Sequence, residues 1–193
     1  MITISDIPEE VKSLLSKVQE FSRDEAILAG GYLRDLDHGV EPKDIDIFVP
    51  ADWDRREFFD FLQAYLITPT NFGFKESAEN DDTILEQIIF EDSDVFPGLP
   101  INILVCKSAI KPADRFERFD YGLCQIMYDG EDLLRSAAYM KDKANGTFTL
   151  MRYTGPEAHE NSLQRFKRFK ARYPNHRLVI PDWIVPRVTA YKA

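Results

Sequence analysis

The stretch Gly30–Asp46, GGYLRDLDHGVEPKDID, limits the possible folds more than any other part of the chain. Its end begins an apolar run in which Asp44 and Asp46 are separated by one isoleucine. Side chains two positions apart on a strand share a face, so we expect both aspartates to project together while Ile45 and Ile47 face the core. Paired carboxylates repel each other, and a divalent cation relieves that repulsion. Oxygen ligands of this kind favour Mg²⁺ or Mn²⁺, shared with substrate phosphates.

A glycine pair precedes the aspartates. Gly30-Gly31 follows a short apolar run, residues 26–29, which we predict to be a strand, and it precedes a predicted helix over residues 32–37. Glycine lets a phosphate approach the backbone, and the N-terminus of a helix supplies N–H donors. Arg34, one turn into the helix, is placed to reach the same phosphates. Either motif alone is commonly structural, but together they predict a nucleoside triphosphate at the turn and its metal at the aspartates.

The hydrophobic pattern predicts one α+β domain, in which helices flank a small mixed sheet. We expect helices over residues 7–21, 54–66, 115–119 and 162–173, and strands over residues 45–49, 71–76, 83–90, 101–106 and 123–128. Asn145-Gly146 is a typical hairpin signal, and it predicts a turn between extended segments over 139–143 and 147–152.

Charge is distributed unevenly along the chain. The net charge is −9, yet residues 161–193 hold eight Lys or Arg and a single acid, a net of +7 that leaves −16 for residues 1–160. We therefore divide the chain into a main domain, 1–160, and a basic C-terminal helical extension, 161–193. Two interpretations of the extension stay open. Its basic face is either solvated or paired on the acidic body, or it forms a groove wall that attracts the triphosphate or RNA.

Composition excludes other classes of protein. No apolar run approaches the ~20 residues of a membrane span, so we expect no membrane partner. The start of the chain lacks the pattern of a signal peptide. Cys106 and Cys124 lie in apolar runs without metal-ligand spacing, and we interpret both as reduced core residues of a cytoplasmic protein.

The segment AGGYLRD…EPKDIDIFV resembles the head domain of the DNA polymerase β-type nucleotidyltransferase superfamily. Within it, the pattern is most similar to the branch of CCA-adding enzymes and bacterial poly(A) polymerases, which carry G-G-x-x-R-D followed by D-x-D. The resemblance implies a nucleotidyltransferase fold and a metal-dependent transfer of a nucleoside monophosphate to a hydroxyl acceptor, with release of pyrophosphate. The acceptor is left open between RNA, a protein and a small molecule. The implied residues are Gly30, Gly31, Arg34 and Asp35 at the nucleotide, and Asp44 and Asp46 as catalytic ligands of two magnesium ions.

A second segment resembles the same branch. Arg118-Phe119-Asp120-Tyr121 is similar to its R-R-D-F segment, which implies that Arg118 and Asp120 contact the nucleotide. Phe119 replaces the second arginine of that pattern, and Gly122 and Cys124 stand where the branch carries Thr and Asn.

Two further positions bear on catalysis. Many members of the superfamily place a third carboxylate on a neighbouring strand, where this chain has Asn102, which cannot accept a proton from an attacking hydroxyl. Asn102 therefore keeps open a rival interpretation, a nucleotide-binding or interaction module with weakened catalysis. Glu131–Arg135 spells E-D-x-x-R, a base-reading motif in CCA-adding enzymes, but it follows Asp120 too closely and we interpret it as coincidence.

Overall fold

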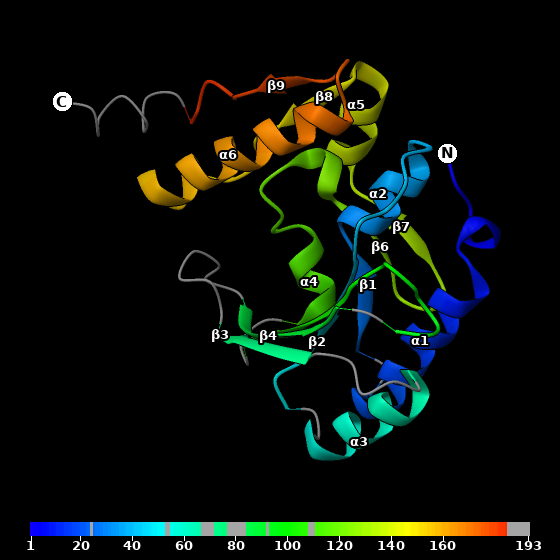
Figure 1. Ribbon diagram of the computed structural model, residues 1–193. Coiled ribbons are helices and arrows are strands. Elements are labelled where there is room, and N and C mark those ends of the chain that lie inside the picture. Colours follow the sequence, from blue (N-terminus) through cyan, green and yellow to red (C-terminus); the bar gives the residue numbers. More distant parts are fainter. Residues whose placement is uncertain are drawn as a thin grey trace.

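The computed structural model describes residues 1–23, 25–52, 55–66, 72–76, 84–91, 93–107 and 111–184. In this part of the chain, seven strands form one mixed sheet in the order β3-β4-β5-β2-β1-β6-β7 (Figure 1). The strands are β1 Ile27–Ala29, β2 Ile45–Val49, β3 Phe72–Glu76, β4 Ile84–Phe90, β5 Ile101–Cys106, β6 Ile126–Tyr128 and β7 Leu133–Arg135. The helices are α1 Glu9–Phe21, α2 Gly31–Asp37, α3 Arg55–Leu66, α4 Pro112–Phe116, α5 Ala137–Asn145 and α6 Pro156–Arg172, with short 3-10 turns at Ile4–Asp6 and Gly122–Cys124.

The strand that is predicted to present the metal-binding aspartates lies at the centre of the sheet. Strands β2 and β5 pair in parallel, in a register that sets Asp46 opposite Asn102. The other neighbouring pairs are antiparallel. Ile45, Ile47 and Val49 have no exposed surface. The alternation predicted from the sequence is therefore confirmed, and the α+β class with it.

Helices cover the sheet because their apolar stripes match its apolar face. In α1, Val11, Leu14, Leu15 and Val18 recur at helical spacing, and all four are buried. None of the described helices combines the length and the apolar character needed to cross a membrane. Cys106 and Cys124 are buried, and neither forms a disulfide with a described residue, as expected of core thiols.

A second layer lies at one end of the sheet (Figure 1). It consists of α5, α6 and a two-stranded parallel sheet of β8 Thr147–Thr149 and β9 Arg177–Val179. Phe148 of β8 stacks on Phe169 of α6 with ring centroids 4.8 Å apart, and the ring of Tyr121 packs against both. This aromatic cluster holds α6 against the main domain.

The predicted hairpin at Asn145-Gly146 is wrong. Residues 137–145 form helix α5, and Gly146 ends it in a left-handed conformation, with φ 60° and ψ 50°. The Ser136 side chain caps the start of the helix by accepting a hydrogen bond from the Tyr139 N–H. Asn-Gly suits a left-handed helix end as well as a hairpin, and here the N-terminal cap and helical packing decide between them.

The division into residues 1–160 and 161–193 stays a prediction. The boundary falls inside α6, which begins at Pro156 and runs without interruption to Arg172. A helix is therefore shared by the two predicted parts.

Candidate active site

The glycine pair forms the turn between β1 and α2. Gly30 has φ +83°, a conformation that side chains rarely adopt, and its carbonyl accepts the first hydrogen bond of the helix from the Arg34 N–H. A Cβ at Gly31 would lie 3.6 Å from Oδ1 of Asp44. The pair therefore brings bare backbone to the predicted metal-binding carboxylates.

Asp44 and Asp46 lie where the sequence predicts, on one face at the start of β2, and both are half-buried. Asn102 of β5 donates a hydrogen bond from Nδ2 to Oδ1 of Asp46 at 2.8 Å. The register of the parallel pair makes this contact, and it confirms that Asn102 occupies the neighbouring inward-facing position.

The electrostatics of this carboxylate pair are unfavourable for two negative charges. Burial and the charge of Asp44 raise the pKa of Asp46 to about 7, although the donor on Asn102 acts in the opposite direction. Burial and the charge of Asp35 also raise the pKa of Asp44. The surrounding cations do not fully offset the cost of two negative charges here, and a divalent cation bound by both carboxylates would do so.

Arg34 and Asp35 form a buried ion pair, with 3% and 1% of their surface exposed. The Arg34 guanidinium donates to Oδ1 of Asp35 from Nε at 2.9 Å and from Nη2 at 2.6 Å. It also donates to the Tyr173 hydroxyl at 3.1 Å, and that hydroxyl donates in turn to Asp35. Arg172 donates to the other carboxylate oxygen of Asp35. Their nucleotide-binding role stays a prediction, since both side chains are engaged with internal partners.

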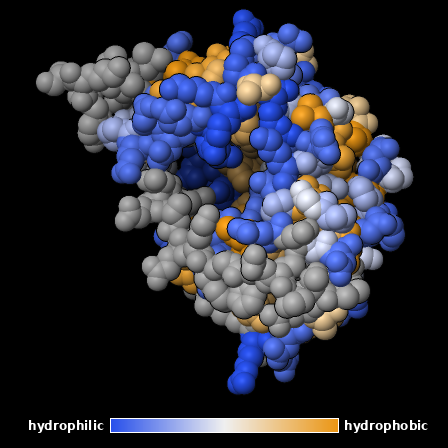
Figure 2. All heavy atoms as spheres, viewed as in Figure 1, coloured by the Kyte–Doolittle hydropathy of each residue, from blue (hydrophilic) through white to orange (hydrophobic). Residues whose placement is uncertain are grey.

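Helix α6 supplies the wall opposite the glycine turn. A cavity of about 220 Å³ lies between them. The surface is hollowed below α6, and hydrophilic residues lie along the upper edge of the opening (Figure 2). Its charged lining residues are Arg34, Asp35, Lys43, Asp44, Asp46, Arg165, Arg168 and Arg172. Its other described lining residues are Gly30, Gly31, Phe119, Cys124 and Phe169. The arrangement can hold a cation at its carboxylates and phosphates at its arginines and lysine.

Comparison with solved structures identifies this architecture. A Thermotoga maritima CCA-adding enzyme, solved in complex with tRNA, matches 96% of this chain with a TM-score of 0.62 and 18% identity. CCA-adding enzymes solved with ATP and with CTP match the same share, with TM-scores of 0.60 and 0.58 and 16% identity. This chain has the nucleotidyltransferase fold. It spans 42% of each of those three chains. Comparisons with models of protein families and with curated proteins found no match.

The second segment predicted from the resemblance lies only partly at the cavity of this nucleotidyltransferase fold. Phe119 lines it, and Asp120 reaches it through Arg165, whose Nη1 donates to Oδ1 of Asp120 at 2.7 Å. Arg118 is exposed and does not line the cavity, and its carbonyl accepts a hydrogen bond from Arg152. The predicted nucleotide contact of Arg118 therefore has no support from this geometry, whereas Asp120 positions an arginine of the wall.

The E-D-x-x-R segment lies in the β6–β7 hairpin, away from this cavity. Arg135 donates to the carbonyl of Ile2 at 2.7 Å, and its Nε lies 3.6 Å from Asp37. The arginine of the segment thus ties the N-terminus to α2. This placement agrees with its interpretation as coincidence.

Sequence reasoning did not assign Lys43, Arg165, Arg168, Phe169 and Arg172 to the site. The basic amphipathic pattern of the extension was the available signal, and it left pairing and a groove wall as alternatives. Both are present. Arg165 and Arg172 are paired with Asp120 and Asp35, while Arg168 lines the cavity.

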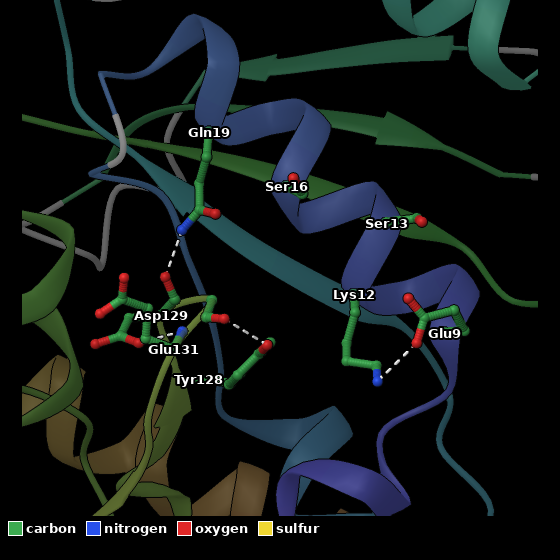
Figure 3. A pocket seen from close by; sticks show the side chains of 9 residues that line it. Glu9, Lys12, Ser13, Ser16, Gln19, Tyr128, Asp129 and Glu131 are labelled. Atoms are coloured by element: carbon green, nitrogen blue, oxygen red, sulfur yellow. Dashed lines mark hydrogen bonds and ion pairs between the residues drawn. The ribbon is translucent and has the colours of Figure 1, made fainter.

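A larger cavity, of about 540 Å³, lies between α1 and the β6–β7 turn. In Figure 3 several of its polar groups bind one another: Lys12 binds Glu9, Gln19 donates to the Asp129 carbonyl, and the Tyr128 hydroxyl donates to the Gly130 carbonyl. None of the predicted site residues lines it. Its size alone therefore does not make it the functional site.

Proposed function

We propose that this chain is a metal-dependent nucleotidyltransferase that moves a nucleoside monophosphate from a nucleoside triphosphate to a hydroxyl acceptor, releasing pyrophosphate. The observation that carries the proposal is the half-buried pair Asp44 and Asp46 beside the bare turn at Gly30-Gly31, in a cavity with a cationic wall. Resemblance of the fold to CCA-adding enzymes solved with ATP and CTP supports the same class of substrate.

The donor set fits magnesium or manganese bound together with a substrate. Among the described residues, no group of three or more His, Cys, Asp or Glu is arranged to hold a metal. Two carboxylates suit Mg²⁺, which commonly completes its coordination with water and substrate phosphates. A divalent ion bound by Asp44 and Asp46 would supply the positive charge that a phosphoryl displacement requires.

The remaining residues orient the substrate. The backbone at Gly30-Gly31 lets the phosphates approach without a side chain between them, and α6 closes the opposite side. Asn102 holds the Asp46 carboxylate by its hydrogen bond and cannot act as a base, so the acceptor hydroxyl must lose its proton to another group.

Incubation with α-labelled nucleoside triphosphates, Mg²⁺ or Mn²⁺ and total RNA tests this proposal. We expect label in an acid-insoluble product with the wild-type protein and none with Asp44→Ala or Asp46→Ala. Asp52→Ala, which removes an exposed carboxylate on the same domain, is the matched control and should leave the product unchanged.

A second candidate is a nucleotide-binding module with weakened catalysis, and Asn102 opposite Asp46 favours it. Tight nucleotide binding without any labelled product, across RNA, protein and small-molecule acceptors, would support this candidate over the enzyme.

We also propose RNA as a partner of the basic extension, consistent with the neighbour solved in complex with tRNA. Lys167 and Arg177 are exposed and lie outside the cavity. Lys167→Gln with Arg177→Gln should weaken RNA binding and reduce its salt dependence, because each lost phosphate contact lowers the slope by about one. If the salt dependence of RNA affinity does not change, the basic face of the extension is solvated and does not bind RNA.

A further inference from the structure

The charges that line the cavity are not equally available to a ligand. Among the residues that the structure describes, five cations and three carboxylates line it, a net of +2 in a chain of net charge −9. Arg34 and Arg172 share Asp35, and Arg165 is paired with Asp120. In the described part of the chain, the two remaining cations, Lys43 and Arg168, have no carboxylate within ion-pair distance.

These two cations come from different elements. Lys43 immediately precedes Asp44 at the start of β2, and Arg168 lies on α6 at the other side of the cavity. Both side chains belong to exposed residues, so no burial cost opposes their movement toward an anion. Lys43 and Arg168 line the same cavity as the carboxylates that would hold a divalent ion. An anion bound there would meet the positive charge of Lys43, of Arg168 and of that ion.

The same walls offer little that distinguishes one base from another. Among the described lining residues there is no Ser, Thr, Asn, Gln or His. The remaining polar side chain, Cys124, is 1% exposed and accepts a hydrogen bond from Arg34 at 3.3 Å. Among the described residues, the walls therefore offer a base edge only charged groups, and three of these, Arg34, Arg165 and Arg172, are already paired with carboxylates.

The aromatic residues are also largely occupied. Phe169 stacks on Phe148 at 4.8 Å, and the Arg34 guanidinium lies 4.6 Å from the centre of its ring. The Arg165 guanidinium lies 5.5 Å from the same ring centre, so protein groups already surround this ring. Phe119 has Arg115 over its ring at 4.7 Å, which leaves at most one face for a base. Stacking on that face tolerates any base, since every base has a π-face.

The volume of the cavity agrees with a site that binds the polyphosphate more than the base. The described walls enclose about 220 Å³, below the roughly 300 Å³ at which pockets for whole drug-sized ligands begin. This space has room for a polyphosphate with its metal.

We propose that this cavity selects its substrate by the polyphosphate and not by the base, with Lys43 and Arg168 holding the phosphates. This proposal rests on the proposed function, because it concerns the substrate of the same site. It makes the protein a user of nucleoside triphosphates with little base preference.

Calorimetric titration of the full chain with ATP, GTP, CTP, UTP and inorganic tripolyphosphate, each with Mg²⁺, tests the proposal. We expect the four nucleotides to bind within about threefold of one another, and tripolyphosphate within about tenfold. Lys43→Gln and Arg168→Gln should each weaken all five ligands by about tenfold, the effect of losing a charge-assisted hydrogen bond. Arg168→Lys should recover most of the affinity because it keeps the charge.

Lys141→Gln is the matched control, at an exposed position of α5 outside the cavity, and it should bind all five ligands like the wild type. Thermal midpoints equal to that of the wild type would show that the variants are folded. One nucleotide bound more than tenfold tighter than the others would overturn base-independent selection and leave the proposed function standing. Base-independent selection would also be overturned if Arg168→Gln weakened the binding of one nucleotide and left the other four ligands unaffected. If none of the five ligands binds to the folded wild-type protein, the proposed function fails as well.

Discussion

Arg172, the last residue of α6, donates a hydrogen bond to the Asp35 carboxylate, 137 positions earlier in the sequence. The same carboxylate accepts from Arg34 and Tyr173. One buried acid thus joins the first turns of α2 to the end of α6, and both sides of the cavity depend on it.

Asp35→Ala should destabilise the protein by about 3–5 kcal/mol, because it leaves the buried Arg34 guanidinium without its counter-charge. Urea unfolding followed by circular dichroism measures the loss. Asp52→Ala, which breaks an ion pair with Arg23 in which both side chains are more than half exposed, should change the free energy of unfolding by no more than about 1 kcal/mol. Equal effects from the two variants would show that Asp35 does not hold α6.

The two glycines of the turn should respond differently to alanine. Gly30→Ala places a side chain at φ +83° and ψ −122°, a sparsely populated backbone region, and should cost about 1–3 kcal/mol in the free energy of unfolding. Gly31→Ala meets its nearest neighbour at 3.6 Å, an ordinary contact, and should be neutral or stabilising in a helix. The new methyl would nevertheless stand beside Asp44, so nucleotide affinity should fall in Gly31→Ala even though its stability does not. Thermal melting together with calorimetric titration separates the two effects.

The raised pKa of Asp46 predicts a specific pH dependence of stability. Its pKa of about 7 lies above the ordinary value of 3.8, so the metal-free fold binds this proton more tightly than the unfolded chain does. The stabilisation is complete below pH 3.8 and is lost as the pH rises toward 7. Asp46→Asn, which can still accept from Asn102, should therefore be more stable than the wild type at pH 8, by a few kcal/mol at about 1.4 kcal/mol per pKa unit, and similar to it at pH 4.

Melting curves in chelator from pH 4 to pH 8 provide the measurement for Asp46→Asn. Added Mg²⁺ or Mn²⁺ should raise the midpoint of the wild type at pH 8 and have little effect on the variant. If the melting midpoints of the wild type and of Asp46→Asn change equally with pH across this range, the pKa of Asp46 is not raised in the folded protein.

Asn102→Asp should convert a hydrogen-bond donor into a third carboxylate 2.8 Å from Asp46. We expect a lower thermal midpoint without metal at pH 8, since like charges then face each other, and Mn²⁺ affinity tighter by about tenfold or more. Asn102→Leu removes the donor without adding a ligand, so it should lower stability without tightening metal binding. If Asn102→Asp binds metal no better than the wild type, β5 does not belong to the metal site.

Sequence reasoning could predict features that depend on neighbours along the chain. The shared face of Asp44 and Asp46 follows from strand alternation, and the turn at Gly30 follows from the conformational freedom of glycine. Strand β7 was not predicted, because Leu133–Arg135 is too short to show a period. Helix α5 was mistaken for part of a hairpin because the Asn-Gly signal at its end is common to both structures.

The cationic wall could not be predicted for a different reason. Arg168 and Phe169 lie close to the glycine turn only because the aromatic cluster around Phe148 holds α6 in place. A local sequence pattern cannot predict a contact between residues that are more than a hundred positions apart. The sequence therefore predicted the carboxylates and the turn, and left the placement of the opposite wall open.

The continuity of α6 from Pro156 to Arg172 has a consequence for biosynthesis. A ribosome that has reached residue 160 has made every strand of the large sheet, but it has not yet made the cations of α6. Asp35 meanwhile lacks two of its three partners. The nascent protein thus acquires its pocket only after α6 has been made, and a fragment ending at residue 160 should be recovered as an aggregation-prone species without affinity for nucleotides.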